Sequence, residues 1–267
     1  MLLHDKVIIV TGAGAGLGAG IARVCHDEGA CVVIADLSAE NANTVGGELG
    51  ERAVAVGCDV RNEADQQTLV RTAQERWGRV DGLVNNAGVN FAKAFLDTTR
   101  EDWDRVIETD LAAVFFLTQK VCRAMLAQEP AGGAIVNIAS VHTLAALPGA
   151  GPYDAAKWGV VGMGKSMAVE LAAQGIRVNA VSPGLCGTQI WTDIMAAAPS
   201  EAECLDHWRK QIPLGRVTAP EEVGQSVAFL LSDRSSSTTG ANLLVDGGMT
   251  SQLISKEPYE PKAIEGA

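Results

Sequence analysis

A glycine-rich turn between two apolar runs near the N-terminus is the feature that most constrains the fold. Residues 7–10 form a short β-branched run without alternation, which is typical of a parallel strand buried on both faces. Residues 11–18 follow with the sequence Thr-Gly-Ala-Gly-Ala-Gly-Leu-Gly, and a helix is predicted from about Leu17 to Glu28. Such a turn lets the backbone approach a phosphate, where free N–H groups and the helix dipole favour the anion. A tight turn without a ligand would use glycine too, so both interpretations stay open at this point.

A second strand and the acid at its end favour a dinucleotide. Residues 31–35 form another apolar run, which ends at Asp36. In a dinucleotide fold, an acid about 20 positions after the glycines accepts hydrogen bonds from the adenosine ribose hydroxyls. A carboxylate at this position also repels a 2′-phosphate. The sequence therefore predicts NAD rather than NADP as the cofactor.

The alternation of strand and helix continues along the chain. Further strands are predicted at residues 53–60, 80–84, 133–138, 176–181 and 241–246. Helices are predicted at residues 63–77 and 103–128; one more helix ends at residue 171, and another begins at residue 219. This alternation implies a parallel, doubly wound α/β sheet with right-handed crossovers and helices on both faces. The 267 residues, 47% of them hydrophobic, suit one domain that spans residues 1–267.

Two segments depart from this regular pattern. Residues 185–214 show weak periodicity with two Trp, a His and several acids, and we expect them to form a lobe that covers the substrate. The polar tail, residues 249–267, is predicted either to cross to a neighbouring subunit or to be disordered.

Charge and cysteine usage exclude several classes of function. The net charge is −11, and no stretch is rich in Lys and Arg, which argues against nucleic acid or an anionic membrane surface as a partner. The first apolar run is stopped by Thr11 and Gly12, so we predict neither a signal peptide nor a membrane span and expect a cytoplasmic protein. The six cysteines lack C-x-x-C spacing, so no metal site and no disulfide framework is predicted.

The stretch from Ser140 to Lys157 carries the residues for proton transfer. Ser140 closely follows a predicted buried strand, and Tyr153 and Lys157 lie four residues apart where a helix starts. Residues at this spacing share one helix face, so the ammonium can lie beneath the phenol and favour its anionic form. We therefore predict a Ser/Tyr/Lys proton-transfer site. The same spacing also fits a Gly/Pro loop leading into a helix whose Tyr and Lys face water.

Together these motifs resemble the short-chain dehydrogenase/reductase family over nearly the whole chain. The matching motifs stand in the family's order: T-G-x-x-x-G-x-G at residues 11–18, N-N-A-G at 85–88, Ser140, Y-x-x-x-K from Tyr153 to Lys157, P-G at Pro183 and Gly184 with Thr188 following, and D-G-G at 246–248. The resemblance implies a Rossmann-type sheet of about seven parallel strands in the order 3-2-1-4-5-6-7. It also implies a homotetramer.

The resemblance further implies a role for each matching residue. Tyr153 would exchange a proton with the substrate oxygen, Lys157 would assist it and hold the nicotinamide ribose, and Ser140 would orient the reacting group. The residues implied to contact the cofactor are Gly12, Ala15, Gly16, Leu17, Gly18, Asp36, Asp59, Val60, Asn86, Ala87, Gly88, Tyr153, Lys157, Pro183, Gly184, Leu185 and Thr188.

One residue departs from the family pattern. Asp110 stands where many relatives carry Asn, which is the fourth member of their catalytic group and part of a water relay to the Lys. An ionised Asp accepts hydrogen bonds but cannot donate them. If the relay depends on the main-chain carbonyl, Asp110 can still serve; if it needs the amide side chain, the relay is altered.

We therefore expect an NAD-dependent oxidoreductase that interconverts a secondary alcohol and a ketone, working mainly as a dehydrogenase. The candidate pocket residues combine hydrogen-bonding groups with indole rings, which suits a sugar, polyol or sugar acid as the substrate. These residues are Asn90, Lys93, His142, Gln189, Trp191, His207, Trp208 and Arg209. Each of them can instead be a surface or packing residue. The alternatives are an NADPH-dependent 3-oxoacyl reductase and a non-catalytic NAD-binding regulator that kept the fold.

Overall fold

A seven-stranded parallel sheet forms the centre of the protein, in the order β3-β2-β1-β4-β5-β6-β7 predicted above. The computed structural model describes residues 1–253, apart from the side chain of residue 190, so most of the predicted tail lies outside the described residues. The strands are β1 (Val7–Thr11), β2 (Cys31–Asp36), β3 (Ala53–Gly57), β4 (Gly82–Asn85), β5 (Gly133–Ile138), β6 (Ile176–Pro183) and β7 (Asn242–Val245).

The apolar runs form central strands that are buried on both faces, as predicted. All five residues of β1 are buried, and β1 pairs with β2 and β4 in parallel register. One boundary differs from the prediction of a strand at residues 53–60: β3 ends at Gly57. The chain turns after Cys58 because the Asp59 carboxylate accepts the Arg61 N–H (3.0 Å), and Asn62 then caps the next helix.

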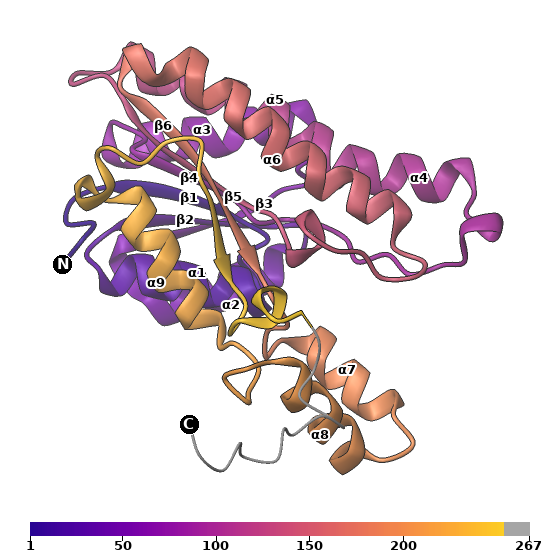
Figure 1. Ribbon diagram of the computed structural model, residues 1–267. Helices are drawn as coiled ribbons and strands as arrows, with labels where there is room; N and C mark the ends of the chain where they lie inside the picture. Colours follow the sequence, from indigo (N-terminus) through magenta and orange to yellow (C-terminus); the bar gives the residue numbers. More distant parts are fainter. Residues whose placement is uncertain (254–267) are drawn as a thin grey trace, which may run out of the picture.

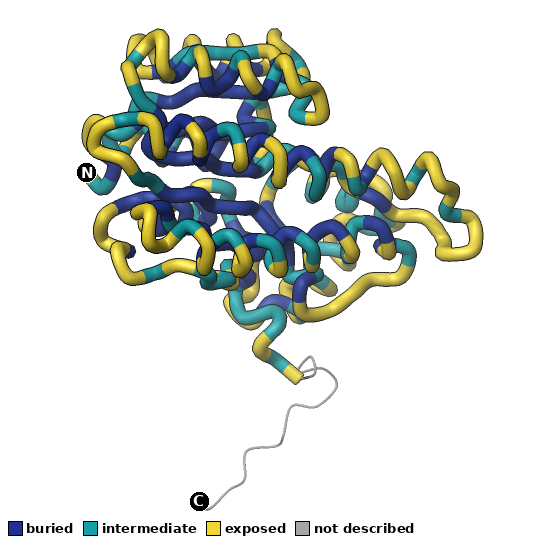
Figure 2. The backbone as a smooth tube through the Cα atoms, turned by 90° about the horizontal axis from the view of Figure 1, so that it is seen from above, coloured by how far each residue is buried: buried dark blue, intermediate teal, exposed yellow. Residues whose placement is uncertain are grey.

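Helices cover both faces of the sheet (Figure 1). On one face lie α1 (Gly16–Asp27), α2 (Ala39–Leu49) and α9 (Pro220–Leu231), and on the other lie α3 (Glu63–Trp77), α5 (Ala113–Ala127) and α6 (Gly151–Leu171). Each layer encloses its own apolar core against the sheet. Figure 2 shows the buried segments in the interior and the exposed turns of the helices outside. Within residues 1–253, none of the helices is long and apolar enough to cross a membrane.

The cysteines form no disulfide bonds within the described residues. All six are free thiols. Burial raises the pKa of Cys25, Cys58 and Cys186 to about 12, so these three thiols stay protonated at neutral pH.

The helix predicted at residues 103–128 contains a wider turn. It begins as α4 (Arg100–Ile107), continues as a π-helical turn at Glu108–Ala112, and ends as α5. A π turn inserts an extra residue into the helix and is found mostly at functional sites. Here it includes Asp110.

The segment at residues 185–214 contains two helices, α7 (Gln189–Ala197) and α8 (Glu201–Gln211). They project from the body of the molecule beyond the end of β6 (Figure 1). The sequence showed little periodicity here because α8 has no buried residue and hence no apolar stripe.

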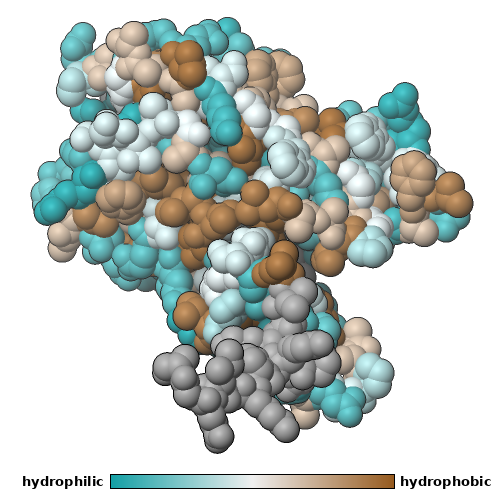
Figure 3. Space-filling model, viewed as in Figure 1, coloured by the Kyte–Doolittle hydropathy of each residue, from teal (hydrophilic) through white to brown (hydrophobic). Residues whose placement is uncertain are grey.

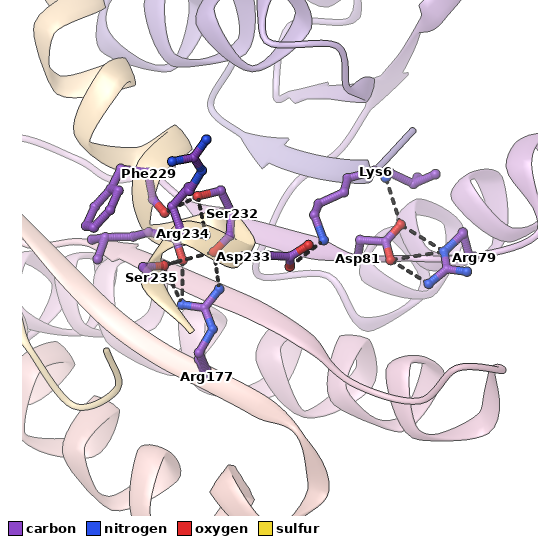
Figure 4. Close-up of polar contacts among 11 residues, drawn as sticks. Lys6, Arg79, Asp81, Arg177, Phe229, Ser232, Asp233, Arg234 and Ser235 are labelled. Carbon is purple, nitrogen blue, oxygen red and sulfur yellow. Dashed lines mark hydrogen bonds and ion pairs between the residues drawn. The ribbon is translucent and has the colours of Figure 1, made fainter. Parts of the chain in front are cut away.

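Polar contacts fasten the edge of the sheet where the strands begin (Figure 4). The Asp81 carboxylate, just before β4, accepts the Val7 N–H at 2.9 Å and three hydrogen bonds from the Arg79 Nε and Nη2 at 2.7–3.0 Å. Arg177, at the start of β6, donates to the carbonyls of Leu230 (2.7 Å) and Ser232 (3.0 Å). These groups join β1 to β4 and β6 to α9, far from the opposite edge where parallel strands bind ligands.

We predict that Arg177→Ala lowers the free energy of unfolding by about 2 kcal/mol, because it leaves the Leu230 and Ser232 carbonyls with only the single Ser235 hydroxyl as a side-chain donor. Urea unfolding at fixed protein concentration measures the change. Arg100→Ala is the matched control, since the Arg100 side chain is 83% exposed in its ion pair. Equal midpoints for the two variants would contradict the role of Arg177.

Candidate active site

The residues predicted to transfer a proton lie together near the carboxyl end of β5. Ser140 lies two residues beyond this strand and is buried. Its Oγ accepts the His142 N–H at 3.2 Å, and its carbonyl accepts the Thr143 N–H and hydroxyl at 3.0 and 2.8 Å. The Thr143 hydroxyl also contacts the Ser182 hydroxyl of β6 at 3.2 Å. Ser140 is therefore fixed between two neighbouring strands.

Tyr153 and Lys157 enter this region from the first two turns of α6. Lys157 Nζ lies 5.3 Å from the centre of the Tyr153 ring and donates to the Ile138 carbonyl at 3.3 Å. Tyr153 is half-buried and packs against a small apolar cluster that includes Phe91 and Val106. Only 6% of Lys157 is exposed. The alternative in which both side chains face water is therefore wrong.

Asp110 is the buried partner of Lys157. Its Oδ2 lies 3.2 Å from Lys157 Nζ, and its Oδ1 accepts the Val89 N–H at 2.8 Å. Burial by itself would lower the pKa of Lys157, but the negative charge of Asp110, the charge of Tyr153 and the Asp110 hydrogen bond outweigh it and raise that pKa. The carboxylate thus contacts the Lys directly.

The glycine-rich turn has the conformation that a phosphate site needs. Gly12 and Gly16 have φ of +62° and +54°, which only glycine adopts without strain. A Cβ at Gly16 would have only Thr188 near it, at 3.6 Å, so this turn is open and faces the loop after β6. No side chain caps α1 at Ala15, which leaves the first N–H groups of that helix for an anion. The turn therefore fits the pyrophosphate of a dinucleotide.

Asn86 supports the turn from β4. Its Nδ2 donates to the carbonyls of Thr11 (2.9 Å) and Gly12 (3.1 Å). A Cβ at Gly18 would come within 2.1 Å of the Gly12 carbonyl oxygen, so the turn and the helix meet too closely for any other residue. The Asn86 side chain thus holds the backbone of the turn.

Asp36 also contacts the turn. Its Oδ2 accepts the Gly14 N–H and its Oδ1 accepts the Ser38 N–H, both at 2.9 Å. The carboxylate lies at the end of β2, beside the glycines, as the ribose-binding acid of a dinucleotide fold must. This donor and acceptor set fits the adenosine end of the cofactor.

The remaining predicted cofactor residues lie along the same edge of the sheet. Asp59 is ion-paired with Arg61 (2.6 Å), whose hydrogen bond lowers the pKa of that carboxyl. Gly88 is so near Asp110 that an added Cβ would lie 2.7 Å from its Oδ2. The other predicted positions lie at or after the ends of β3, β4 and β6: Val60, Ala87, Pro183, Gly184 and Leu185. Pro183 ends β6, and Thr188 precedes α7.

Of the candidate substrate residues, only His142 touches the Ser140/Tyr153/Lys157 group within the described chain. Its ring packs edge-on against the Tyr153 ring at 5.3 Å between centroids. Four of the others make contacts elsewhere: Lys93 with Asp102 (2.5 Å), Gln189 with Asp193 (2.8 Å), and His207 with Trp208 (5.6 Å between ring centroids). Asn90 and Arg209 are exposed, and Trp191 is half-exposed on α7.

Asp154 is a functional candidate that sequence reasoning missed. Its Oδ1 lies 2.5 Å from Nδ1 of His142. The two residues are twelve positions apart, across an irregular loop, so no periodicity links them. The available signal was a carboxylate next to Tyr153 and a histidine two residues after Ser140.

Comparison with known proteins identifies the family. A family model described as enoyl-(acyl carrier protein) reductase matches residues 12–250, and the meso-2,3-butanediol dehydrogenase of Serratia marcescens is 39% identical over 251 residues, which cover 94% of this chain and 96% of that protein. The chain belongs to the short-chain dehydrogenase/reductase family. Membership makes it a short-chain oxidoreductase, which confirms the reaction class predicted above.

Two further short-chain dehydrogenases/reductases are similar at comparable levels. The 3-oxoacyl-(acyl-carrier-protein) reductase of Thermotoga maritima is 39% identical over 252 residues, which cover 93% of this chain and 99% of that protein. The structure of the 3-ketoacyl-(acyl-carrier-protein) reductase of Brucella melitensis complexed with NADH matches with a TM-score of 0.84 at 34% identity, covering 93% of this chain and 99% of that one.

We predict that Asp110→Ala destabilises the protein by about 3 kcal/mol at neutral pH and lowers turnover at least tenfold, because the buried ammonium of Lys157 loses its partner. Asp110→Asn keeps an acceptor oxygen and should remain active. Since the folded-state pKa of Lys157 is raised, the stabilisation is present below the ordinary lysine pKa of about 10.4 and is lost as the pH rises through the folded value. Wild-type stability and turnover in both variants would remove Asp110 from the site.

Proposed function

We propose that this protein is an NAD-dependent dehydrogenase that interconverts a secondary alcohol and a ketone on a small polar substrate such as a sugar, polyol or sugar acid. The observation that carries the proposal is the buried ammonium of Lys157 under the ring of Tyr153, with Ser140 at the same strand end. This arrangement suits a proton-transfer site.

The chain's own residues handle the proton. In the oxidative direction, the Tyr153 phenolate takes the proton of the substrate hydroxyl, and the Ser140 hydroxyl hydrogen-bonds the same oxygen. The Lys157 ammonium, 5.3 Å from the ring, stabilises the negative phenolate. A bound nicotinamide would supply the acceptor for the hydride that leaves the carbon bearing this hydroxyl. Reduction of a ketone runs these steps in reverse.

The preference for NAD rests on Asp36 and its neighbour. A 2′-phosphate would lie against the Asp36 carboxylate, which is already the acceptor for the Gly14 N–H. The next residue, Leu37, is 73% exposed and offers no positive charge to a phosphate. NADP enzymes of this fold need an arginine there or nearby.

A second candidate is reduction of a 3-oxoacyl thioester with NADPH. The names of the Thermotoga maritima and Brucella melitensis reductases favour the 3-oxoacyl reaction, but the Brucella melitensis protein is complexed with NADH, and the Serratia marcescens relative is named for a diol. The charge at Asp36 and the histidine beside Tyr153 favour the polar alcohol. The lobe formed by α7 and α8 is the part of the chain that we propose covers the substrate.

We also propose a homotetramer in the cytoplasm. Free thiols suit a reducing compartment. Large apolar side chains are exposed on outer elements: Phe115 and Phe116 on α5, Trp158 on α6, and Leu243 and Leu244 on the edge strand β7. Figure 3 shows hydrophobic surface near the centre of the view, where β7 runs in Figure 1. Patches of this kind mark subunit contacts, and light scattering after gel filtration tests the proposal.

We predict that Tyr153→Phe lowers kcat at least a hundredfold with little change in NAD affinity, because the ring stays in place and only the proton acceptor is lost. A spectrophotometric screen for NADH production across sugars, sugar acids, polyols and hydroxy acids supplies the substrate. NAD binding by calorimetry is the control for folding. Near-normal turnover in Tyr153→Phe would refute the mechanism, and NAD binding without turnover of any alcohol would revive the non-catalytic alternative.

We predict that Asp36→Asn lowers the ratio of kcat/KM for NAD over NADP at least tenfold. The amide keeps an acceptor for the Gly14 N–H but removes the charge that repels a 2′-phosphate. Initial rates with each cofactor measure the ratio. A wild-type enzyme that prefers NADPH would overturn the NAD assignment and favour the 3-oxoacyl reductase.

A further inference from the structure

His142 and Asp154 form an acid–histidine pair beside Tyr153 that the proposed reaction does not use. Asp154 Oδ1 lies 2.5 Å from His142 Nδ1, and the two side chains are only 18% and 17% exposed. The backbone N–H of His142 is held by Ser140 Oγ at 3.2 Å. Ser140 therefore holds the backbone of His142, and Asp154 in the first turn of α6 holds its ring.

The pair determines which nitrogen of His142 is free. An ionised carboxylate only accepts hydrogen bonds, so Nδ1 carries the proton that Asp154 receives. In the neutral ring Nε2 is then an acceptor, and in the protonated ring it is a donor. Within residues 1–253, Nε2 makes no hydrogen bond. Next to Tyr153, an oriented nitrogen thus has no hydrogen-bond partner among residues 1–253.

The position of the ring limits what this nitrogen can bind. The His142 ring stands perpendicular to the Tyr153 ring at 5.3 Å, whereas Tyr153 and Ser140 are already assigned to the reacting oxygen. The group that binds His142 Nε2 is therefore one other than the reacting oxygen, and a polar group on the adjacent carbon meets this condition. A hydroxyl fits best, because it can donate to the neutral nitrogen and accept from the protonated one.

We propose that His142 binds the second hydroxyl of a vicinal diol, or of the matching α-hydroxyketone, and that Asp154 positions the His142 ring for this contact. The inference rests on the proposed function and narrows its substrate class. His142 is the specificity-determining residue, and Asp154 is a positioning residue that acts through it. The substrate is a molecule with hydroxyls on adjacent carbons, oxidised at one of them.

Matched substrates test the proposal. For the best alcohol in the NADH screen, kcat/KM is compared with that of the analogue in which hydrogen replaces the adjacent hydroxyl. The smallest such pair is 2,3-butanediol and 2-butanol, and a cyclic pair is cis-1,2-cyclohexanediol and cyclohexanol. The wild type should prefer the diol of each pair at least tenfold, because a site built to bind a hydroxyl rejects an analogue that lacks it.

Variants separate the specific contact from a structural role. In His142→Leu we expect kcat/KM for the diol to fall about tenfold and that for the mono-alcohol to change less than twofold, so that the preference is lost. His142→Gln, which keeps a polar group, should restore part of it. Asp154→Asn should lower the preference in the same direction. The same change at Asp27, whose Oδ1 lies 3.6 Å from His26 on α1, should leave all rates unchanged.

A binding measurement adds a readout that does not depend on turnover. In Tyr153→Phe loaded with NAD, calorimetry should give a tighter Kd for 2,3-butanediol than for 2-butanol, and adding His142→Leu should remove the difference. A best substrate without an adjacent hydroxyl, or equal losses on both members of a pair in His142→Leu, would overturn the proposal while leaving the dehydrogenase intact. A wild type that oxidises no alcohol would instead overturn the proposed function, and this inference with it.

Discussion

A buried ammonium that must keep its charge sets the geometry of this site. Lys157 is almost fully enclosed, and an isolated charge so far from water would be very costly. Asp110 compensates that cost at 3.2 Å, and the π turn between α4 and α5 contains this carboxylate. Gly88 leaves the space for it, because a Cβ there would collide with Asp110. The loop after β4, the broken helix and α6 therefore depend on one ion pair.

A few contacts of the loop after β4 also connect the Ser140/Tyr153/Lys157 group to the glycine-rich turn. Asn86, just after β4, donates to the carbonyls of the glycine-rich turn, so the loop that supports Asp110 also holds this turn. The amino and carboxyl ends of the strands have different roles. Asp81 and Arg177 fasten the edge where strands begin, and the chemistry lies where they end, as parallel sheets require.

The irregular loop between β5 and α6 is where we propose that substrate specificity arises. Ser140 and Tyr153 lie near its two ends, whereas His142 and Asp154 are turned toward each other by the fold of the loop itself. A pair of this kind can change the preferred substrate without moving Tyr153 or Lys157, because it contacts the substrate and not the proton path. This separation lets one scaffold serve several alcohols.

The sequence by itself determined the sheet, the glycine-rich turn, the acid after β2 and the Ser140/Tyr153/Lys157 group. These features are local: a buried parallel strand needs a continuous apolar run, a tight phosphate turn needs glycine, and a helix face sets the four-residue spacing. Only the tertiary structure decided that Lys157 is buried against Asp110, that Asn86 holds the turn, and that Asp154 holds His142. Each of these contacts joins residues on different elements or across an irregular loop, where no period of the chain relates one residue to the other. The two helices of residues 185–214 escaped prediction for a related reason, since α8 buries no residue and so carries no apolar stripe in its sequence.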